Sequence, residues 1–349
     1  MSGLAEFAIS LKVVVGRGAL RRLPSMLREL GSARVSLFTD DVVWGIVGKD
    51  VAQMLEDERF DVQVHLVGPS TLEEFEKGRE AVRETSAQVV VGLGGGRVID
   101  AAKYAAFRVG ARMVSAPTSV AHDGVASPTI SFKGKDGRPV SLLARLPDAV
   151  VADLSVISKA PRRLIASGFA DILGKLTSVR DALLAYRLGD RVSLYALELA
   201  STALRIAVRN VEGIARMSAS GLEALVMAAI TSGVAVAVDG SSRPISGSEH
   251  LFSHALDLVY PQRRSLHGEQ VGVGTIMMSY LHGLDWRRAR ALLLKVGAPV
   301  DAKGLGVPPD AVVEALTMAH KVRKRYTILG ERGLSPEAAR RLAEETLVI

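Results

Sequence analysis

The segment Val89-Val-Val-Gly-Leu-Gly-Gly-Gly-Arg-Val-Ile-Asp100 decides how the first half of the chain folds. Its apolar start is typical of a buried β-strand, and the residues from Val98 onward have the pattern of a helix. Between the two, Gly94, Gly95 and Gly96 leave backbone amides open to an anion at a helix N-terminus. The segment therefore predicts a strand, a pyrophosphate-binding turn and a helix. A tight turn that binds no ligand is the alternative.

Strand and helix patterns alternate on both sides of this segment, up to about residue 154. Strands are expected over 7–15, 34–39, 62–67, 88–91, 112–115 and 149–153, and helices over 20–30, 43–55, 71–85 and 98–108. Such alternation is typical of a mostly parallel, Rossmann-like sheet with helices on both faces. The segment Lys133-Gly-Lys-Asp-Gly137 lies between two β-prone stretches and predicts a hairpin.

The pattern changes near Leu154, after which almost every segment has helical periodicity. Helices are expected over 162–188, 192–215, 222–238, 248–259, 269–284, 286–295, 309–326 and 336–347. A chain of 349 residues is also too long for one comfortable core. We therefore predict a dinucleotide-binding α/β domain over residues 1–154 and an all-α domain over residues 155–349.

Composition limits the class of protein. Hydrophobic residues make up 48% of the chain and charged residues 23%, which is typical of a globular protein. No run approaches about 20 uninterrupted apolar residues, and the start lacks the regions of a signal peptide. We therefore expect a cytoplasmic protein that does not insert into membranes. The chain has no cysteine, so any zinc must be held by nitrogen and oxygen.

The net charge of +7 favours an anionic partner. Basic residues are scattered along predicted helices, as in 205–209 and 321–325, and aromatic residues are few. This distribution argues against nucleic acid and leaves a small phosphate-bearing ligand as the expected partner. Scarce asparagine and glutamine, with arginine more frequent than lysine, indicate adaptation to heat.

Three of the seven histidines, His250, His254 and His267, lie close together in the helical half. A helix that begins near Ser248, with this serine as its cap, places His250 and His254 on one face. Gly268 allows His267 to lie at a helix start and fold back toward that pair. Because neutral imidazole is a common zinc ligand, the cluster predicts an open metal site in the helical domain. Surface or core histidines are the alternative.

A polar loop, Ala116-Pro-Thr-Ser-Val-Ala-His-Asp-Gly-Val-Ala-Ser127, follows the strand expected over 112–115. In open α/β sheets, ligands bind beyond the carboxyl ends of strands. Thr118 and Ser119 are suited to hydrogen-bond a nicotinamide or its ribose, and Asp123 a substrate hydroxyl. A loop without a ligand is the alternative.

Asp40 lies at the end of the strand expected over 34–39. The glycine segment is on the fourth strand and lacks the usual acidic residue about 20 positions later, so it is not an ordinary first-turn dinucleotide motif. Asp40 is therefore the candidate for the adenosine ribose. Capping the helix that follows is an equally supported role.

Taken together, these motifs resemble a known superfamily. They are Gly-Gly-Gly-x-x-x-Asp at Gly94–Asp100, Pro-Thr-Ser at Pro117, Gly-Phe-Ala-Asp171-x-x-x-Lys175, Ser-Glu-His250-x-x-x-His254 and His267-Gly-Glu. The combination resembles the iron-containing alcohol dehydrogenase, glycerol dehydrogenase and dehydroquinate synthase superfamily. Within it, the loop from Ala116 and the segment Ser-Arg-Pro-x-Ser-Gly-Ser-Glu-His250 are most similar to the sn-glycerol-1-phosphate dehydrogenase family. The resemblance covers roughly residues 12–283.

That resemblance implies a dehydroquinate synthase-like fold and the NAD(P)H-dependent reduction of dihydroxyacetone phosphate to sn-glycerol 1-phosphate, which sets the glycerol stereochemistry of archaeal membrane lipids. It implies a zinc ion held by Asp171, His250 and His267, and substrate contacts from Asp123, Asp171 and His254. It also implies that NAD(H) or NADP(H) binds at Gly94, Gly95, Gly96, Arg97, Val98, Ile99, Asp100, Thr118, Ser119, Val120, Ala121 and Ser127.

Arg243, seven residues before His250, is the candidate for the substrate phosphate. In dehydroquinate synthase an arginine at the matching offset contacts the substrate's anionic group. Together with Ser246 and Ser248 at a helix start, Arg243 predicts a phosphate pocket. A surface arginine before a proline turn is the alternative.

Two rival functions remain open from the sequence. A dehydrogenase for unphosphorylated glycerol is the nearest, and dehydroquinate synthase matches less well because its loop motifs differ. A metal- and nucleotide-binding module without turnover is a rival of another class. A homo-oligomer is expected in each case.

Overall fold

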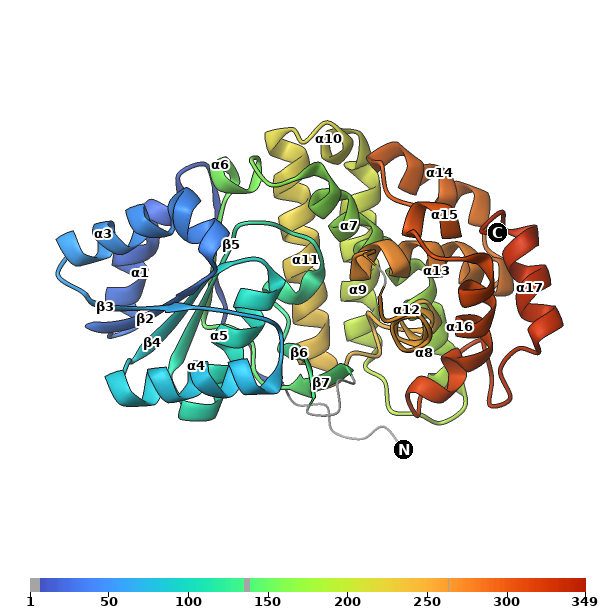
Figure 1. Ribbon diagram of the computed structural model, residues 1–349, viewed down its shortest axis with the longest axis horizontal. Coiled ribbons are helices and arrows are strands. Elements are labelled where there is room, and N and C mark those ends of the chain that lie inside the picture. Colours follow the sequence, from blue (N-terminus) through green and yellow to red (C-terminus); the bar gives the residue numbers. More distant parts are fainter. Residues whose placement is uncertain (1–6, 135–138, 263) are drawn as a thin grey trace. The chain divides into compact units, whose positions relative to one another are not determined.

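The computed structural model describes residues 7–134, 139–262 and 264–349, and the chain divides into two compact units (Figure 1). The first unit comprises the chain up to Val120 together with Gly124–Ala160, and the second comprises Ala121–Asp123 with Pro161–Ile349. The division therefore lies later than the expected boundary after Leu154. The reason is that the short helix α6 (Leu154–Ile157) packs on strands β1 (Lys12–Gly16) and β8 (Ala149–Asp153) of the first unit.

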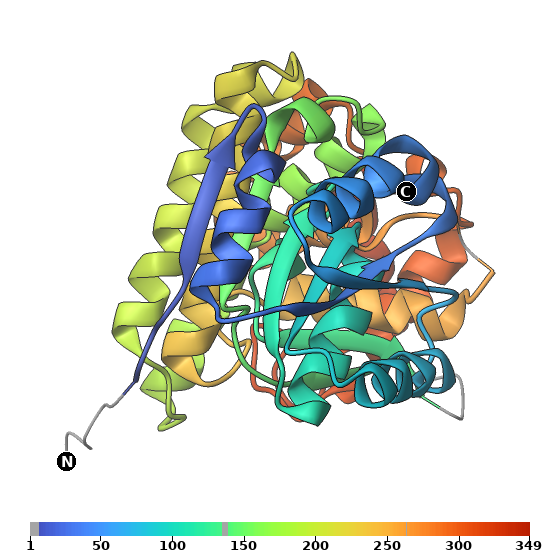
Figure 2. The same ribbon diagram turned by 90° about the vertical axis from the view of Figure 1, so that its left-hand side faces the viewer.

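The first unit contains a six-stranded sheet in the order β1-β8-β5-β4-β2-β3, and every pairing in it is parallel. Its other strands are β2 (Arg34–Thr39), β3 (Asp61–Leu66), β4 (Val89–Gly94) and β5 (Arg112–Pro117). In Figure 2, β1 is the dark-blue strand at one edge of this sheet. The predicted parallel, Rossmann-like sheet is confirmed.

Helices cover both faces of this sheet. They are η1 (Ala19–Arg22), α1 (Leu23–Glu29), α2 (Asp41–Val43), the π-helical η2 (Trp44–Gly48), α3 (Lys49–Asp57), α4 (Leu72–Thr85) and α5 (Gly96–Val109), and the short η3 (Asp123–Val125) lies in the loop after β5. Alternate strand residues such as Leu37, Val91 and Val114 form one hydrophobic core with the apolar sides of α1 and α3. Helices α4 and α5 lie on the opposite face (Figure 1).

Two further strands, β6 (Thr129–Lys133) and β7 (Pro139–Leu143), pair in antiparallel fashion. This pairing confirms the predicted hairpin, whose turn over 135–138 lies outside the described residues.

The direction of chain progression across the sheet reverses at β2, which has β3 on one side and β4 on the other. In open parallel sheets, such a reversal marks the position where ligands bind, beyond the carboxyl ends of the strands. Asp40 directly follows β2, and Gly95 and Gly96 directly follow β4. The fold thus brings two predicted cofactor segments to the same end of neighbouring strands.

The regular secondary structure of the second unit, over its described residues, is entirely helical, as predicted. Its helices are α7 (Arg162–Leu173), α8 (Lys175–Arg187), α9 (Leu194–Arg209), α10 (Val211–Ala215), α11 (Ala219–Asp239), α12 (Ser248–Val259), α13 (His267–Leu281), α14 (Trp286–Val296), α15 (Ala302–Leu305), α16 (Pro309–Val322) and α17 (Pro336–Glu345). The single helix expected over 162–188 is divided at Gly174, and the one over 192–215 at Asn210. Helix α16 ends at Val322 because Arg323 has an extended backbone.

Helix α11 is, among the described residues, the one helix long and apolar enough by length and composition to span a membrane, with 21 residues. Glu223 and Ser232 interrupt its apolar sequence, so it is not an uninterrupted apolar run of about 20 residues. However, 67% of its most apolar window is buried inside the protein, which is typical of a core helix. Its composition therefore follows from packing within the second unit.

Candidate functional site

Asp171, His250 and His267 meet within the second unit, from α7, α12 and α13. One ligand atom from each lies within 4.8 Å of the others. Asp171 Oδ1 lies 3.4 Å from His250 Nε2 and 3.9 Å from His267 Nε2. Among the described residues, this buried oxygen accepts no hydrogen bond. One oxygen and two nitrogens directed at a common point suit a divalent metal with an open coordination position.

Close contact between α13 and α7 brings His267 to this point. A Cβ atom added at Gly268 would lie 2.1 Å from the Ser167 carbonyl oxygen, so only glycine allows the two helices this separation. His267, the first residue of α13, is thereby carried to Asp171. Gly268 therefore acts through packing and not through backbone freedom at the helix start.

The hydrogen bonds of His267 define which ring nitrogen is free. Gln270 Nε2 donates to Ser265 Oγ, so Gln270 Oε1 is the acceptor for the Ser253 hydroxyl at 2.6 Å. Ser253 Oγ then accepts from His267 Nδ1–H at 3.1 Å. Burial lowers the pKa of His267 to about 3, which keeps the ring neutral. His267 is thus held with the lone pair of Nε2 available to a metal.

Lys175, to which the sequence patterns assigned no role, organises the carboxylates of the site. Its fully buried ammonium lies 2.8 Å from Asp123 Oδ2 and 3.5 Å from Asp171 Oδ2. The Asp123 N–H also donates to Asp171 Oδ2, at 3.0 Å. Asp171 therefore has one oxygen satisfied by the protein and the other left for a metal. The four-residue spacing from Asp171 to Lys175 is the only sequence signal for this pairing.

The charge of this group favours a cation. Burial lowers the pKa of Lys175, but the attraction of Asp123 and Asp171 outweighs burial and raises it above its ordinary value. Burial likewise raises the pKa of Asp171, yet Lys175 and His250 hold it well below its usual range. Glu249 adds a third buried carboxylate. Three carboxylates outnumber one ammonium, so a divalent cation would offset the excess charge.

His254 lies beside the metal-site residues but is not one of them. Its ring stacks on that of His267, with centroids 5.7 Å apart. Burial and the nearby Arg323 hold the pKa of His254 well below its ordinary value. Within the described part of the chain, its buried Nδ1 has no hydrogen-bond partner. A neutral imidazole of this kind suits a substrate hydroxyl, and the contact of His254 with the substrate stays a prediction.

In the first unit, the glycine turn has the geometry expected of an anion site. Strand β4 ends at Gly94, and Gly95 precedes α5 without a side-chain cap on the helix amides. The Thr118 N–H donates to the Gly94 carbonyl at 3.0 Å, which places the second predicted cofactor loop beside the turn. Val98 and Ile99 point into the core, so only their backbone can contact a cofactor.

The rest of that loop is largely enclosed. Ser119 and Val120 are buried, and the Ser119 hydroxyl would lie 3.6 Å from a Cβ atom added at Gly95. Ala121 already belongs to the second unit, where its carbonyl accepts from the Ser167 hydroxyl at 2.9 Å.

Two predicted cofactor residues, Asp100 and Ser127, have internal partners. The Asp100 carboxylate lies 2.9 Å from the buried Lys103 ammonium and accepts the Ser131 N–H at 3.1 Å. Ser127 Oγ accepts the Thr129 N–H at 3.1 Å, and Lys103 donates to the Ser127 carbonyl. Both side chains thus support the loop before β6, and their direct contact with the cofactor stays a prediction.

Each carboxylate oxygen of Asp40 has a partner in the protein. Its Oδ1 accepts the Val43 N–H at 2.9 Å, which confirms the helix cap. Its Oδ2 lies 3.2 Å from Arg97 Nη2 at the start of α5. The contact with the adenosine ribose stays a prediction.

The structure changes the expected surroundings of Arg243. Its guanidinium pairs with the Asp190 carboxylate and donates to the Tyr326 carbonyl at 3.1 Å. The prediction that Ser248 caps the helix is wrong, because Gly247 is the N-cap residue. The Ser248 hydroxyl instead donates to Asp181 at 2.6 Å. The phosphate contact of Arg243 stays a prediction.

Solved structures confirm the predicted fold. A glycerol dehydrogenase from Schizosaccharomyces pombe is similar over 99% of this chain and 91% of its own, with a TM-score of 0.81 and 22% identity. A probable glycerol dehydrogenase from Sinorhizobium meliloti 1021 covers 98% of both chains, with a TM-score of 0.80 and 21% identity. At these identities the likeness concerns the fold alone.

Sequence comparison gives the family. Residues 14–161 match the family described as iron-containing alcohol dehydrogenase. A glycerol-1-phosphate dehydrogenase [NAD(P)+] from Thermofilum pendens is 49% identical over 96% of each chain. The enzyme of that name from Hyperthermus butylicus is 44% identical over 99% of each chain. The chain therefore belongs to the glycerol-1-phosphate dehydrogenase [NAD(P)+] family of the iron-containing alcohol dehydrogenases.

Proposed function

We propose that this protein reduces dihydroxyacetone phosphate to sn-glycerol 1-phosphate with NADH or NADPH, using a zinc ion held by Asp171, His250 and His267. The observation that carries the proposal is the convergence of this ligand set in a chain 49% identical to a glycerol-1-phosphate dehydrogenase [NAD(P)+]. In archaea the product would supply the glycerol backbone of membrane phospholipids.

A bound zinc ion supplies Lewis acidity toward the substrate carbonyl. The chain's own residues supply the rest. Lys175 lies 2.8 Å from Asp123 Oδ2 and helps to hold the pKa of Asp171 well below its usual range, and Asp123 retains its other oxygen for a substrate hydroxyl. His254 hydrogen-bonds a substrate hydroxyl and passes a proton inward from solvent, because its ring is neutral and its Nδ1 is uncommitted among the described residues.

The first unit provides the cofactor site in this proposal. Backbone amides at the start of α5 bind the pyrophosphate, and Thr118 and Ser119 hydrogen-bond the nicotinamide or its ribose. Asp40 accepts from the adenosine ribose. A nicotinamide held there would supply the hydride for reduction of the substrate carbonyl carbon.

Arginines of the second unit support a phosphorylated substrate. Arg325 donates to the Ser246 carbonyl and, at 2.9 Å, to Ser242 Oγ. No carboxylate of the described residues forms an ion pair with Arg325. Burial and repulsion from Arg323 and Arg243 lower its pKa to about 10. A phosphate would relieve this repulsion, so we assign Arg325, together with the predicted Arg243, to the phosphate end of the substrate.

One assay tests the function. NADH absorbance is followed with dihydroxyacetone phosphate, with dihydroxyacetone and without substrate, and the configuration of the product is determined. We expect turnover with the phosphorylated ketone and sn-glycerol 1-phosphate as the product. Faster turnover of dihydroxyacetone would instead identify a dehydrogenase for the unphosphorylated polyol, and no turnover would indicate a binding module.

A cytoplasmic location and a homo-oligomeric state remain part of this proposal. The location is supported by the substrate, because a phosphorylated triose is a charged metabolite of the cell interior. Light scattering of the purified protein tests the oligomer.

A further inference from the structure

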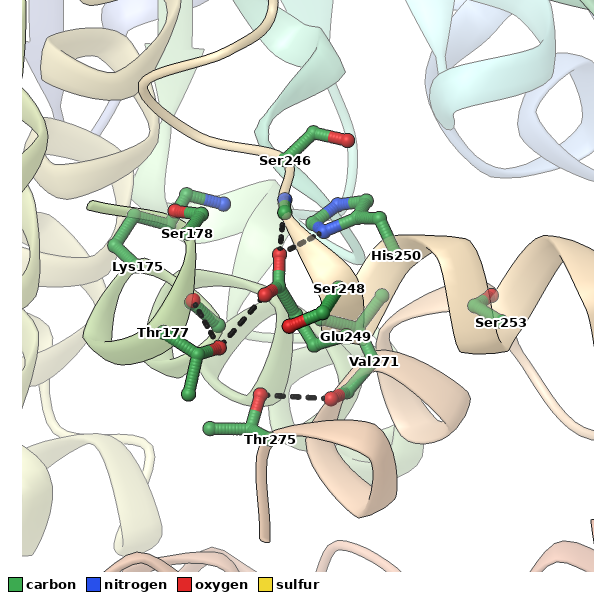
Figure 3. Close-up of polar contacts among 12 residues, drawn as sticks. Lys175, Thr177, Ser178, Ser246, Ser248, Glu249, His250, Ser253, Val271 and Thr275 are labelled. Atoms are coloured by element: carbon green, nitrogen blue, oxygen red, sulfur yellow. Dashed lines mark hydrogen bonds and ion pairs between the residues drawn. The ribbon is translucent and has the colours of Figure 1, made fainter. Parts of the chain in front are cut away.

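A fully buried carboxylate, that of Glu249, lies directly behind the metal-site histidine His250 (Figure 3). Glu249 Oε1 lies 2.7 Å from His250 Nδ1 and accepts the Gly247 N–H at 2.6 Å. Glu249 Oε2 accepts the Thr177 hydroxyl at 2.7 Å. Each carboxylate oxygen therefore has a donor from the protein, and the dashed lines in Figure 3 trace these contacts.

These donors satisfy both oxygens of Glu249 despite its burial: Oε1 accepts the Gly247 N–H and Oε2 accepts the Thr177 hydroxyl. Glu249 also lies in the first turn of α12, where the helix dipole favours a negative charge. A buried ion of this kind is costly unless its partners compensate, so the cluster acts as a unit.

Because both oxygens of Glu249 already act as acceptors, for the Gly247 N–H and the Thr177 hydroxyl, the proton between Glu249 and His250 belongs to His250 Nδ1. The other ring nitrogen, Nε2, then faces Asp171 Oδ1 at 3.4 Å. The Nδ1 partner of the second metal-site histidine, His267, is the neutral hydroxyl of Ser253. The two imidazoles are thus held in the same tautomer, one by a carboxylate and one by a hydroxyl.

We propose that Glu249 is a positioning residue of the metal site: it fixes the tautomer and ring orientation of His250 and increases the donor strength of Nε2. A carboxylate behind a ligating histidine acts in this way, and its removal typically weakens metal binding about 10- to 100-fold. Thr177 assists by holding the other oxygen of Glu249. The inference rests on the proposed zinc site and assigns to Glu249 a role that the motif Ser-Glu-His250 alone does not reveal.

Three variants separate orientation from charge. In Glu249→Gln the amide oxygen is able to accept from Gly247 and His250, while the amide nitrogen faces Thr177, so the shape remains and the charge is lost. Glu249→Leu removes the acceptor as well. Glu269→Gln is the matched control, because Glu269 is also a buried carboxylate in the first turn of a helix but binds Arg163 and the Leu266 N–H.

Zinc dissociation constants are measured with a competing chelator, and thermal unfolding is measured on the chelated proteins. We expect zinc binding to weaken about 10-fold in Glu249→Gln and about 100-fold in Glu249→Leu, and to stay within about threefold in Glu269→Gln. Ring ¹⁵N spectra of the zinc-loaded proteins should show the His250 Nδ1–H in the wild type and lose this signal in Glu249→Leu.

The outcomes are distinct. Wild-type zinc affinity in Glu249→Gln and Glu249→Leu would overturn the role of Glu249 while leaving the proposed function intact. An equal loss of zinc affinity in Glu269→Gln would show a general effect of removing a buried carboxylate. This result would also overturn the role of Glu249. If Glu249→Leu does not fold, Glu249→Gln decides. A wild-type protein that binds no zinc would refute both the metal site and this inference.

Discussion

In the first unit, the Asp40 carboxylate and the Arg97 guanidinium form an ion pair, with Oδ2 and Nη2 3.2 Å apart. Asp40 follows β2 and Arg97 lies in the first turn of α5, so the pair joins the two segments that flank the reversal of strand order. In dinucleotide-binding folds a carboxylate accepts from the ribose 2′-hydroxyl of NADH, whereas an arginine accommodates the 2′-phosphate of NADPH. The pair therefore offers one partner for each cofactor.

This pair predicts a separable cofactor preference. Arg97→Ala should lower kcat/KM for NADPH about tenfold, near the roughly 1.5 kcal/mol of a weak charged hydrogen bond, with little effect on NADH. Asp40→Asn should instead lower kcat/KM for NADH. The asparagine keeps an acceptor for the Val43 N–H, so the helix cap remains. Initial rates with both cofactors measure the ratio of kcat/KM for NADPH to that for NADH in each variant. Equal changes for NADH and NADPH in each variant would contradict this role for the pair.

The metal-site histidines should separate by metal content. His250→Ala and His267→Ala should lose bound zinc, because each removes one of the three converging ligand atoms. His254→Ala should retain zinc and lose turnover. Metal analysis of the purified variants checks this, and absence of zinc from His254→Ala would refute the assignment. Chelation of the wild type should abolish turnover, and added zinc should restore it.

The phosphate end of the substrate should depend on arginine. Arg243→Ala and Arg325→Ala should each lower kcat/KM for dihydroxyacetone phosphate roughly 10- to 150-fold, which corresponds to the roughly 1.5 to 3 kcal/mol of a charged hydrogen bond. Activity on dihydroxyacetone should barely change. Arg243 also pairs with Asp190 and holds the Tyr326 carbonyl. An equal loss on both substrates in Arg243→Ala would therefore show that this residue supports the fold and does not bind the phosphate.

The stability of the metal-free protein should depend on pH through His267. Its pKa is about 3 in the folded protein, against 6.5 for an unperturbed histidine. Between these values the unfolded chain binds more protons, so the free energy of unfolding falls as the pH is lowered. His267→Gln removes this contribution, whereas His250, whose pKa is raised, remains in both proteins. Urea unfolding at several pH values measures the difference in the free energy of unfolding between the wild type and His267→Gln. This difference should narrow toward low pH. A pH-independent difference would contradict the lowered pKa.

Much of the local structure follows from the sequence. The residues predicted for β2, β8 and α12 are those observed, because apolar periodicity and helix-start residues act over a few neighbouring positions. The helix expected over 162–188 is divided instead at Gly174, where a Cβ atom would lie 2.8 Å from Val271 Cγ1. That break depends on packing between distant segments, which periodicity does not report.

For the metal site, too, the sequence predicted the residues, whereas their contacts depend on the tertiary structure. Residue type and spacing predicted a metal site at the cluster of His250, His254 and His267, and the family resemblance implied the ligand set Asp171, His250 and His267, which is the set that converges in the structure. Only the tertiary structure decided which atoms face one another. Glu249 becomes the partner of His250 Nδ1, and Arg243 pairs with Asp190, because hydrogen bonds and ion pairs depend on distances of a few ångströms between groups brought together by folding.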